Sequence, residues 1–326
     1  MRRLRIRVVV VVATAGALAA VLLGGLSACG GPAATERAAA AGTAPVASVA
    51  APQVARILSA VAQASGDGLE ARYAGAELEV RRAALTVRAA VPTSPEPAPL
   101  AGQQLLTAVP PAGTWPRWFL TALQPGGGAV PQVVVLVQEG PRNPYRVVAS
   151  AAVLPGAALP QPASSGGAAE ALPADAPGLV VTPAQAVAGY ADVLTRGDGS
   201  PAAAGLAEDP LRTQVLAEQR AERDGVSGYV DYAAAHAPRE GALWSLRTTD
   251  GGALVVGVLA GKRTFTPRGA GVVQSLPPDL AALAGRSSAP KGLDVSTAEV
   301  VVLRVPTSGQ VALVAGQRGT TGVAVR

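Results

Sequence analysis

Two stretches of the chain that lie 131 residues apart share one pattern, and this repeat constrains the fold more than any other feature. Aligned without a gap, Pro52 falls on Pro183, and Gly-Asp-Gly at 66–68 falls on Gly-Asp-Gly at 197–199. Similarity at a fixed spacing indicates a duplicated architecture. A composition rich in Ala, Gly and Pro also produces such matches by chance, so the neighbouring segments have to support the repeat.

Both stretches are predicted to be helices. Apolar residues at positions 54, 57, 58 and 61 follow the spacing of one helix face, and Pro52 suits the first turn. In the second stretch Thr182 can cap the helix, Pro183 fits its first position, and Gln185 completes a capping box. Each helix is expected to end at its Gly-Asp-Gly sequence.

Strand-like runs follow each predicted helix. They cover 78–89, 105–109, 118–123, 133–138 and 145–154 in the first half, and 242–248, 253–259, 300–305, 311–315 and 322–325 in the second. Residues 211–223 form a further helical stretch, and 278–284 a short helix or turn. Thr249–Gly252 is a hairpin signal. Helices followed by strands, twice, predict an α+β fold with helices packed on a curved antiparallel sheet in each of two domains.

The predicted organisation has five parts. Residues 1–28 are a signal peptide, 29–51 a flexible tether, 52–155 the first α+β domain, 156–178 a linker rich in Pro, Ala, Gly and Ser, and 179–326 the second domain. The two Pro/Gly-rich segments lack apolar periodicity, which is typical of linkers.

The amino terminus predicts export and a lipid anchor. Four arginines precede an uncharged apolar run, Val8–Leu23, which is short for a membrane-spanning helix. Leu26, Ser27 and Ala28 then lead to Cys29, the chain's one cysteine, and this sequence resembles a bacterial lipobox. The resemblance implies that Cys29 is acylated and becomes the new amino terminus, on the extracytoplasmic face of the cell membrane. An uncleaved anchor with an incidental cysteine is the alternative.

Several short motifs resemble an actinobacterial lipoprotein family of unknown function. They are Trp115–Leu120, Pro144–Arg146, Leu154–Gly156 and Arg247–Val255, and the likeness covers about 50–326. The helix-then-sheet plan is also similar to the cone-shaped NTF2-like (cystatin-like) fold. Such folds carry both enzymes and binding modules, so the resemblance implies no particular activity.

Charge and composition exclude several functions. Removal of 1–28 takes away four arginines and no acid, which leaves 23 basic against 22 acidic side chains. A nearly neutral protein has no electrostatic basis for binding nucleic acid. With one histidine, His236, and Cys29 used as the anchor, we expect no metal site, and no cofactor motif is present. His236 is expected at a helix end or in a loop, without a catalytic role.

The remaining candidates are a carboxylate pair and an aromatic patch. Glu77 and Glu79 would share one face of a strand, most simply a solvated face. Trp115, Arg117, Trp118 and Phe119 gather much of the scarce aromatic content and form a possible binding patch at a pocket mouth or interface, with core packing as the alternative.

The sequence therefore favours a non-catalytic module, tethered outside the membrane through Cys29, that binds an envelope protein or a glycan. The alternative is a small-molecule hydrolase or isomerase that uses a carboxylate and a tyrosine in an NTF2-like pocket. A buried Asp or Glu that faces a cavity beside Tyr190, Tyr229 or Tyr232 would favour the enzyme.

Overall fold

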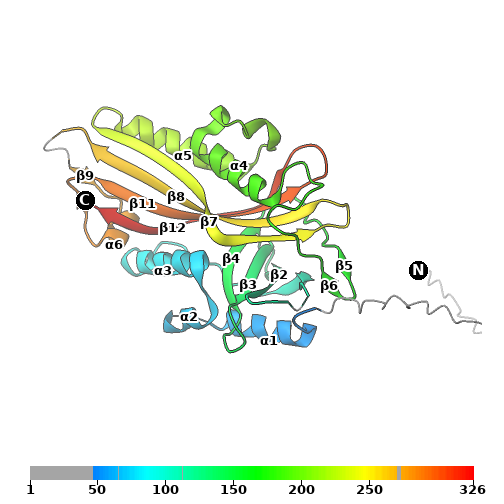
Figure 1. Cartoon of the computed structure of the whole chain (residues 1–326). Helices are drawn as coiled ribbons and strands as arrows, with labels where there is room; N and C mark the ends of the chain where they lie inside the picture. The colour runs from blue at the N-terminus through cyan, green and yellow to red at the C-terminus, as the bar shows by residue number, and fades with distance from the viewer. Residues whose placement is uncertain (1–46, 65, 112, 270–272) are drawn as a thin grey trace, which may run out of the picture. The chain divides into compact units, whose positions relative to one another are not determined.

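A computed structural model describes residues 47–64, 66–111, 113–269 and 273–326, which belong to one compact unit (Figure 1). The helices are α1 (Ala51–Ala62), α2 (Leu69–Arg72), α3 (Gly75–Ala90), α4 (Pro183–Arg196), α5 (Pro210–Val226) and α6 (Pro278–Ala284), with single 3-10 turns at Gly66–Gly68, Gly197–Gly199 and Ala203–Gly205. The strands are β1 (Gln103–Ala108), β2 (Arg117–Gln124), β3 (Gln132–Gln138), β4 (Arg146–Val153), β5 (Ser164–Ser165), β6 (Ala168–Ala169), β7 (Val230–Arg247), β8 (Ala253–Pro267), β9 (Gln274–Ser275), β10 (Ser288–Ala289), β11 (Leu293–Val305) and β12 (Ala312–Val325).

Eight of the strands form one strongly curled antiparallel sheet, in the order β1-β2-β3-β4-β12-β11-β8-β7 (Figure 1). Each half of the chain contributes four strands, and the last strand of each half meets the last of the other. The junction is narrow, because β4 and β12 pair only through Ala152 with Gly316 and Val153 with Ala315. The expected α+β class with antiparallel pairing is confirmed, but the strands of the two halves share one sheet where the sequence predicted two.

The core explains why the two halves form one unit. On one face of the sheet, α1 and α2 cover Val134 and Leu136 of β3, while α4 and α5 cover Val301 and Leu303 of β11. The alternate residues of the same strands point to the other face, because side chains alternate along a strand. There, strands of both halves pack with Val80 of α3 in a single apolar cluster. Neither half can bury that face alone.

Several predicted elements are confirmed. Helix α1 begins next to Pro52, and the Gly-Asp-Gly sequences form 3-10 turns after α1 and α4. The capping box of α4 is complete: Gln185 N donates to Thr182 Oγ1 at 3.2 Å, and Thr182 N donates to Gln185 Oε1 at 3.0 Å. The short helix or turn predicted over 278–284 is helix α6, and the turn after Arg247 joins β7 to β8.

The strand predicted over 78–89 is wrong, because these residues belong to helix α3. The segment is rich in Ala, Glu, Leu and Arg, which are strong helix formers. Glu77 and Glu79 therefore do not share a face. Glu77 is buried, and its Oε1 accepts a hydrogen bond from Arg81 Nε, one turn later, at 2.7 Å. Glu79 is half-exposed and forms a bidentate pair with Arg239 of β7.

All four long strands of the second half exceed the runs predicted for them, and the runs at 311–315 and 322–325 belong to one strand, β12. Strand β7 begins at Val230 and β8 ends at Pro267, so residues outside the predicted strands belong to the sheet. These extensions carry Ala, Gly, Thr and Arg, which give no apolar alternation to read. His236 lies within β7 and is buried, so its predicted place at a helix end or in a loop is wrong.

The segment between the halves is packed against the sheet. Ala163 N donates to Arg247 O at 2.8 Å, and Leu172 N donates to Ser245 O at 2.9 Å, so 156–178 covers one end of the edge strand β7. The end of the predicted tether is packed too, since Ser48 N donates to Pro110 O and Val49 is buried. The predicted signal peptide, the lipobox-like sequence and Cys29 lie outside the described residues. Within the described ranges, no helix is long and apolar enough to cross a membrane.

Candidate functional site

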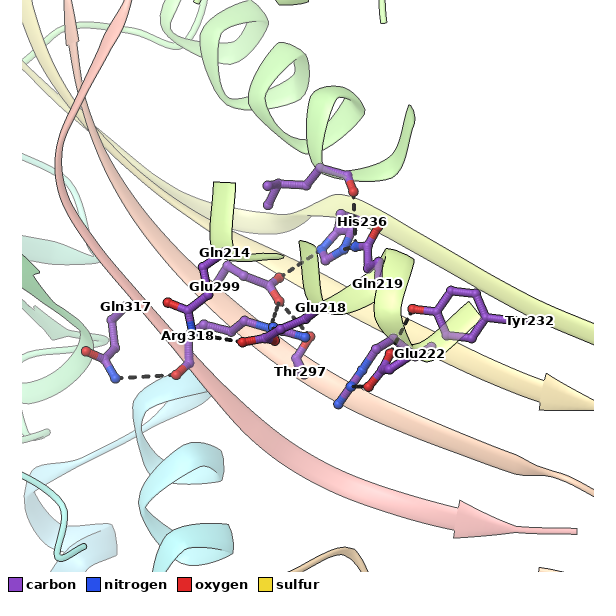
Figure 2. A network of polar contacts seen from close by, with 12 residues as sticks. Gln214, Glu218, Gln219, Glu222, Tyr232, His236, Thr297, Glu299, Gln317 and Arg318 are labelled. Carbon is purple, nitrogen blue, oxygen red and sulfur yellow. Dashed lines mark hydrogen bonds and ion pairs between the residues drawn. The ribbon is translucent and has the colours of Figure 1, made fainter. Parts of the chain in front are cut away.

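A belt of polar residues crosses the sheet beneath α5. It consists of His236, Thr297, Glu299 and Arg318, with Gly261 on the strand between His236 and Thr297. On the α5 face of β11, the residues before the belt (Leu293, Val295) and after it (Val301, Leu303) belong to two separate apolar clusters. Between them, Thr297 and Glu299 point to the same face, and Glu299 is fully buried. Figure 2 shows Glu299 meeting His236 on one side and Arg318 on the other. The belt therefore places a buried carboxylate between two apolar regions.

Gly261 of β8 makes this meeting possible. The register pairs Gly261 with His236 of β7 on one side and with Thr297 of β11 on the other. A Cβ at position 261 would lie 2.2 Å from Thr297 Oγ1, 2.8 Å from Glu299 Oε1 and 2.9 Å from His236 Nδ1. Because Gly261 has no side chain, polar groups of β7 and β11 can meet above β8, which lies between these two strands.

The hydrogen bonds fix the tautomer of His236. Gln219 Nε2 of α5 lies 3.1 Å from the carbonyl oxygen of Leu194, which only accepts, so the amide nitrogen must face it. The same nitrogen lies 2.9 Å from His236 Nε2, which therefore accepts its second hydrogen. The imidazole proton is then on Nδ1 and is donated to Glu299 Oε2 at 3.2 Å.

The other oxygen of Glu299 is also satisfied. Thr297 Oγ1 donates to Glu299 Oε1 at 2.6 Å, and Arg318 Nε of the neighbouring strand β12 lies 3.5 Å away. Arg318 Nη1 in turn donates to Glu218 of α5. A hydrogen-bonded and charge-paired carboxylate can be buried at tolerable cost, whereas an unpaired one cannot.

Helix α5 is attached to the sheet largely through such polar pairs. Besides Glu218 and Gln219, Glu222 accepts hydrogen bonds from Arg263 of β8 and, at 2.9 Å, from Tyr232 Oη of β7. Burial and the adjacent Glu222 raise the pKa of the Tyr232 phenol, which therefore stays protonated at neutral pH. Polar partners explain how a helix with few apolar residues packs on a sheet.

The His236–Glu299 pair has the residue types of a catalytic dyad, but it is closed to solvent. The side chains of His236 and Glu299 are 1% and 0% exposed. A general base must lie within hydrogen-bond reach of a substrate proton. In this arrangement both His236 nitrogens and both Glu299 oxygens are already occupied by protein groups. The geometry fits a structural pair.

A second buried polar cluster joins helices α4 and α5. Asp209 caps α5 by accepting a hydrogen bond from Arg212 N at 2.8 Å, and Tyr190 Oη of α4 donates to both of its carboxylate oxygens. Burial raises the pKa of the Asp209 carboxyl, although hydrogen bonds from Arg212 N and Tyr190 oppose this shift. Burial beside this carboxylate raises the pKa of Tyr190.

The described surface carries three pockets of interest. One, of about 510 Å³, lies between α3, α6 and β12, and buried Glu77, Arg81 and Ser150 line it. Ser150 Oγ donates to Glu77 Oε2 at 2.8 Å. We call it the edge pocket, because four consecutive residues of β12, 317–320, also line it.

The other two pockets differ in chemistry. A pocket of about 660 Å³ at the far end of α5 has mainly apolar walls, including Phe265 and Leu280, with Glu222 and Tyr229 at its rim. Tyr229 is 69% exposed. A pocket of about 580 Å³ lies beside Trp244 and Arg146. None of the three is lined by His236 or Glu299.

The predicted aromatic patch does not form one surface. Arg117 stacks over the ring of Trp115 at 4.3 Å, and both are partly exposed. Trp118 packs against the core shared by the two halves. Phe119 is fully buried on the opposite face of β2, beside Tyr145. Alternation along β2 separates the two rings, so only Trp115 and Arg117 remain together.

No group of three or more His, Cys, Asp or Glu side chains in the part of the chain described by the structure is arranged to hold a metal ion. The belt residues Gly261 and Glu299 were missed by the sequence analysis. One signal was available for Glu299, which is the one acid within the apolar stretch 298–303. No local signal marks Gly261 as the residue that faces His236.

The fold and the belt define an α+β protein whose two halves share a sheet. A family model described as a domain of unknown function (DUF8094) matches residues 59–324, and the chain belongs to this family. An uncharacterized lipoprotein of Streptomyces coelicolor is 32% identical over 149 residues, which are 45% of this chain and 44% of that protein. The match thus spans less than half of its curated relative. No solved structure matches the chain.

Proposed function

We propose that this protein is a lipoprotein held on the extracytoplasmic face of the cell membrane, where it serves as a non-catalytic binding module. The lipobox-like sequence before Cys29 supports the anchor, and the Streptomyces coelicolor relative carries the description of a lipoprotein. A diacylglyceryl group on Cys29 supplies two acyl chains, which suffice for stable anchoring.

One observation carries the non-catalytic part of this proposal. The chain's one histidine, the most versatile acid–base group near neutral pH, is used in the closed pair with Glu299. We also propose that the two halves arose by duplication of an NTF2-like unit. The repeated order of helices followed by four strands supports this origin.

The anchor is tested by fractionating native cells. The Cys29→Ala variant should leave the membrane fraction or accumulate with residues 1–28 attached, whereas Ala33→Ser, four residues further on, should behave as the wild type. Normal processing and membrane retention of Cys29→Ala would contradict the anchor.

The binding role is tested by placing a photoreactive benzoyl-phenylalanine, in separate variants, at the exposed positions Leu105, Val180, Tyr229 and Gln317. The proposal expects a discrete crosslinked product from at least one position, and less of it when Cys29→Ala is added. Absence of a product at all four positions would contradict it.

The second candidate function, a carboxylate-dependent hydrolase or isomerase, rests on Glu222. This carboxylate lines the apolar pocket together with Tyr229 and accepts a hydrogen bond from Tyr232. Its carboxylate is already engaged by Arg263 and by the Tyr232 hydroxyl, which leaves it less free to reach a substrate proton. Turnover of an ester or ketone substrate that is lost in Glu222→Gln, and kept in Glu240→Gln, would favour the enzyme.

A further inference from the structure

The strand β12 has an open edge between its contact with β4 and its carboxyl-terminal end. Strand β4 pairs with β12 only at Ala315 and Gly316, and residues 317–325 pair with β11 alone. Among the described residues, the backbone of 317–320 forms no hydrogen bond on the side away from β11 with another backbone group. Gln317 Nε2 donates to Arg318 O, at a long 3.4 Å.

The edge pocket gives access to this part of β12. Its lining includes all four consecutive residues Gln317–Thr320, whereas a pocket on a sheet face would contact alternate residues. Helix α6 packs against the same apolar cluster as the more distal Val323 and Val325, and β4 ends the opening at the other side. About four residues, or roughly 13 Å of strand, remain accessible.

The walls of the edge pocket set its preference. Val80, Ala84 and Val87 of α3 and Leu283 of α6 give an aliphatic wall. Asp279, at the first turn of α6, is exposed and adds a negative charge at the rim. Glu77 and Arg81 at the base are already paired with each other.

We propose that the edge pocket binds an extended peptide segment of a partner protein, which adds a short strand to β12. The open edge repeats N–H and C=O groups at the spacing of a β-strand, and another extended backbone matches that repeat. The aliphatic wall takes small apolar side chains on one face of the peptide, and Asp279 attracts a basic residue at one end. This inference rests on the proposed binding function and specifies its surface and the chemistry of its partner.

The test uses a displayed library of random heptapeptides selected on the full chain, with the enriched sequences then synthesised and titrated by fluorescence polarisation. The test variant is Ala84→Arg, which places a long side chain into the edge pocket from helix α3, and arginine is a good helix former. The control is Leu85→Arg, because Leu85 lies on the same helix but does not line the pocket. Circular dichroism first verifies that both variants fold. We expect Ala84→Arg to raise the Kd at least tenfold and Leu85→Arg to change it less than twofold.

Peptide backbone methylation separates strand addition from side-chain binding. N-methylation of the alternate amides that face β12 should abolish binding, while methylation of the other amides should preserve it. The inference would be overturned if the selection enriches no peptide, or if the enriched peptides bind Ala84→Arg as tightly as the wild type. It would also be overturned if those peptides tolerate methylation at every amide. If crosslinks form in cells from Leu105, Val180 or Tyr229 but not from Gln317, the binding function stands and this surface is wrong.

Discussion

Replacing Gly261 with alanine tests the polar belt beneath α5. The added Cβ would lie 2.2 Å from Thr297 Oγ1 and 2.8 Å from Glu299 Oε1, well inside contact distance. Thr297 and Glu299 lie on β11 and His236 on β7, so the strands or the side chains have to separate. The carboxylate of Glu299 then loses hydrogen bonds while it stays buried.

The expected magnitude follows from those bonds. A hydrogen bond to a charged group contributes about 1.5–3 kcal/mol, and one or two of the bonds to Glu299 are lost. Alanine in a strand recovers about 0.5–1 kcal/mol relative to glycine. The net decrease in the free energy of unfolding is therefore about 0.5–5.5 kcal/mol, with a central value of about 3 kcal/mol, a large part of the 5–15 kcal/mol typical of a folded domain.

The assay is urea denaturation of the chain without residues 1–28, with unfolding monitored by circular dichroism. Gly322→Ala is the matched control, because Gly322 also lies in a long strand and a Cβ there meets nothing within 4 Å. We expect Gly322→Ala to be about 0.5–1 kcal/mol more stable than the wild type, because alanine replaces a strand glycine there without a clash. A Gly261→Ala protein as stable as this control would refute the account of the belt.

Two further predictions concern buried carboxyl groups. Burial raises the pKa of Asp209 above its unfolded value of about 3.9. The favourable contribution of this carboxyl group to the free energy of unfolding is therefore present at low pH and is lost as the pH rises through the folded-state pKa. Asp209→Asn keeps a capping group and an acceptor for Tyr190, so the stability of the wild type relative to this variant should fall as the pH rises above the unfolded-state pKa; an unchanged difference in urea titrations would contradict this. Glu77→Ala should cost about 3–5 kcal/mol because buried Arg81 loses its partner, while Glu79→Ala should cost less than about 1 kcal/mol; equal costs in thermal or urea melts would argue against the structure of α3.

The sequence predicted the parts of the fold that local chemistry determines. Thr182 and Gln185 flank a proline in the pattern of a capping box, and that helix start is present as expected. The Val-rich runs of β3 and β11 mark strands because their side chains are buried on both faces. These signals lie within a few residues of the structure that they specify.

The errors arise where contacts distant in sequence decide the structure. Glu77 and Glu79 alternate with apolar residues as in a strand, but helix-forming neighbours and the contact of Val80 with β12 favour a helix. His236 is flanked by alanines and carries no sign of its burial, which depends on Glu299 and on the glycine between them. The shared sheet was missed because the β4–β12 junction depends on only two residue pairs.

The lipid anchor on Cys29 is tested most directly by intact-mass and peptide mass spectrometry of the protein purified from the membranes of its own cells. We predict a mature chain that begins at Cys29, with a diacylglyceryl group on the sulfur and none of residues 1–28. A chain that still begins at Met1, or one with an unmodified thiol at position 29, would contradict the proposed place of this protein in the cell.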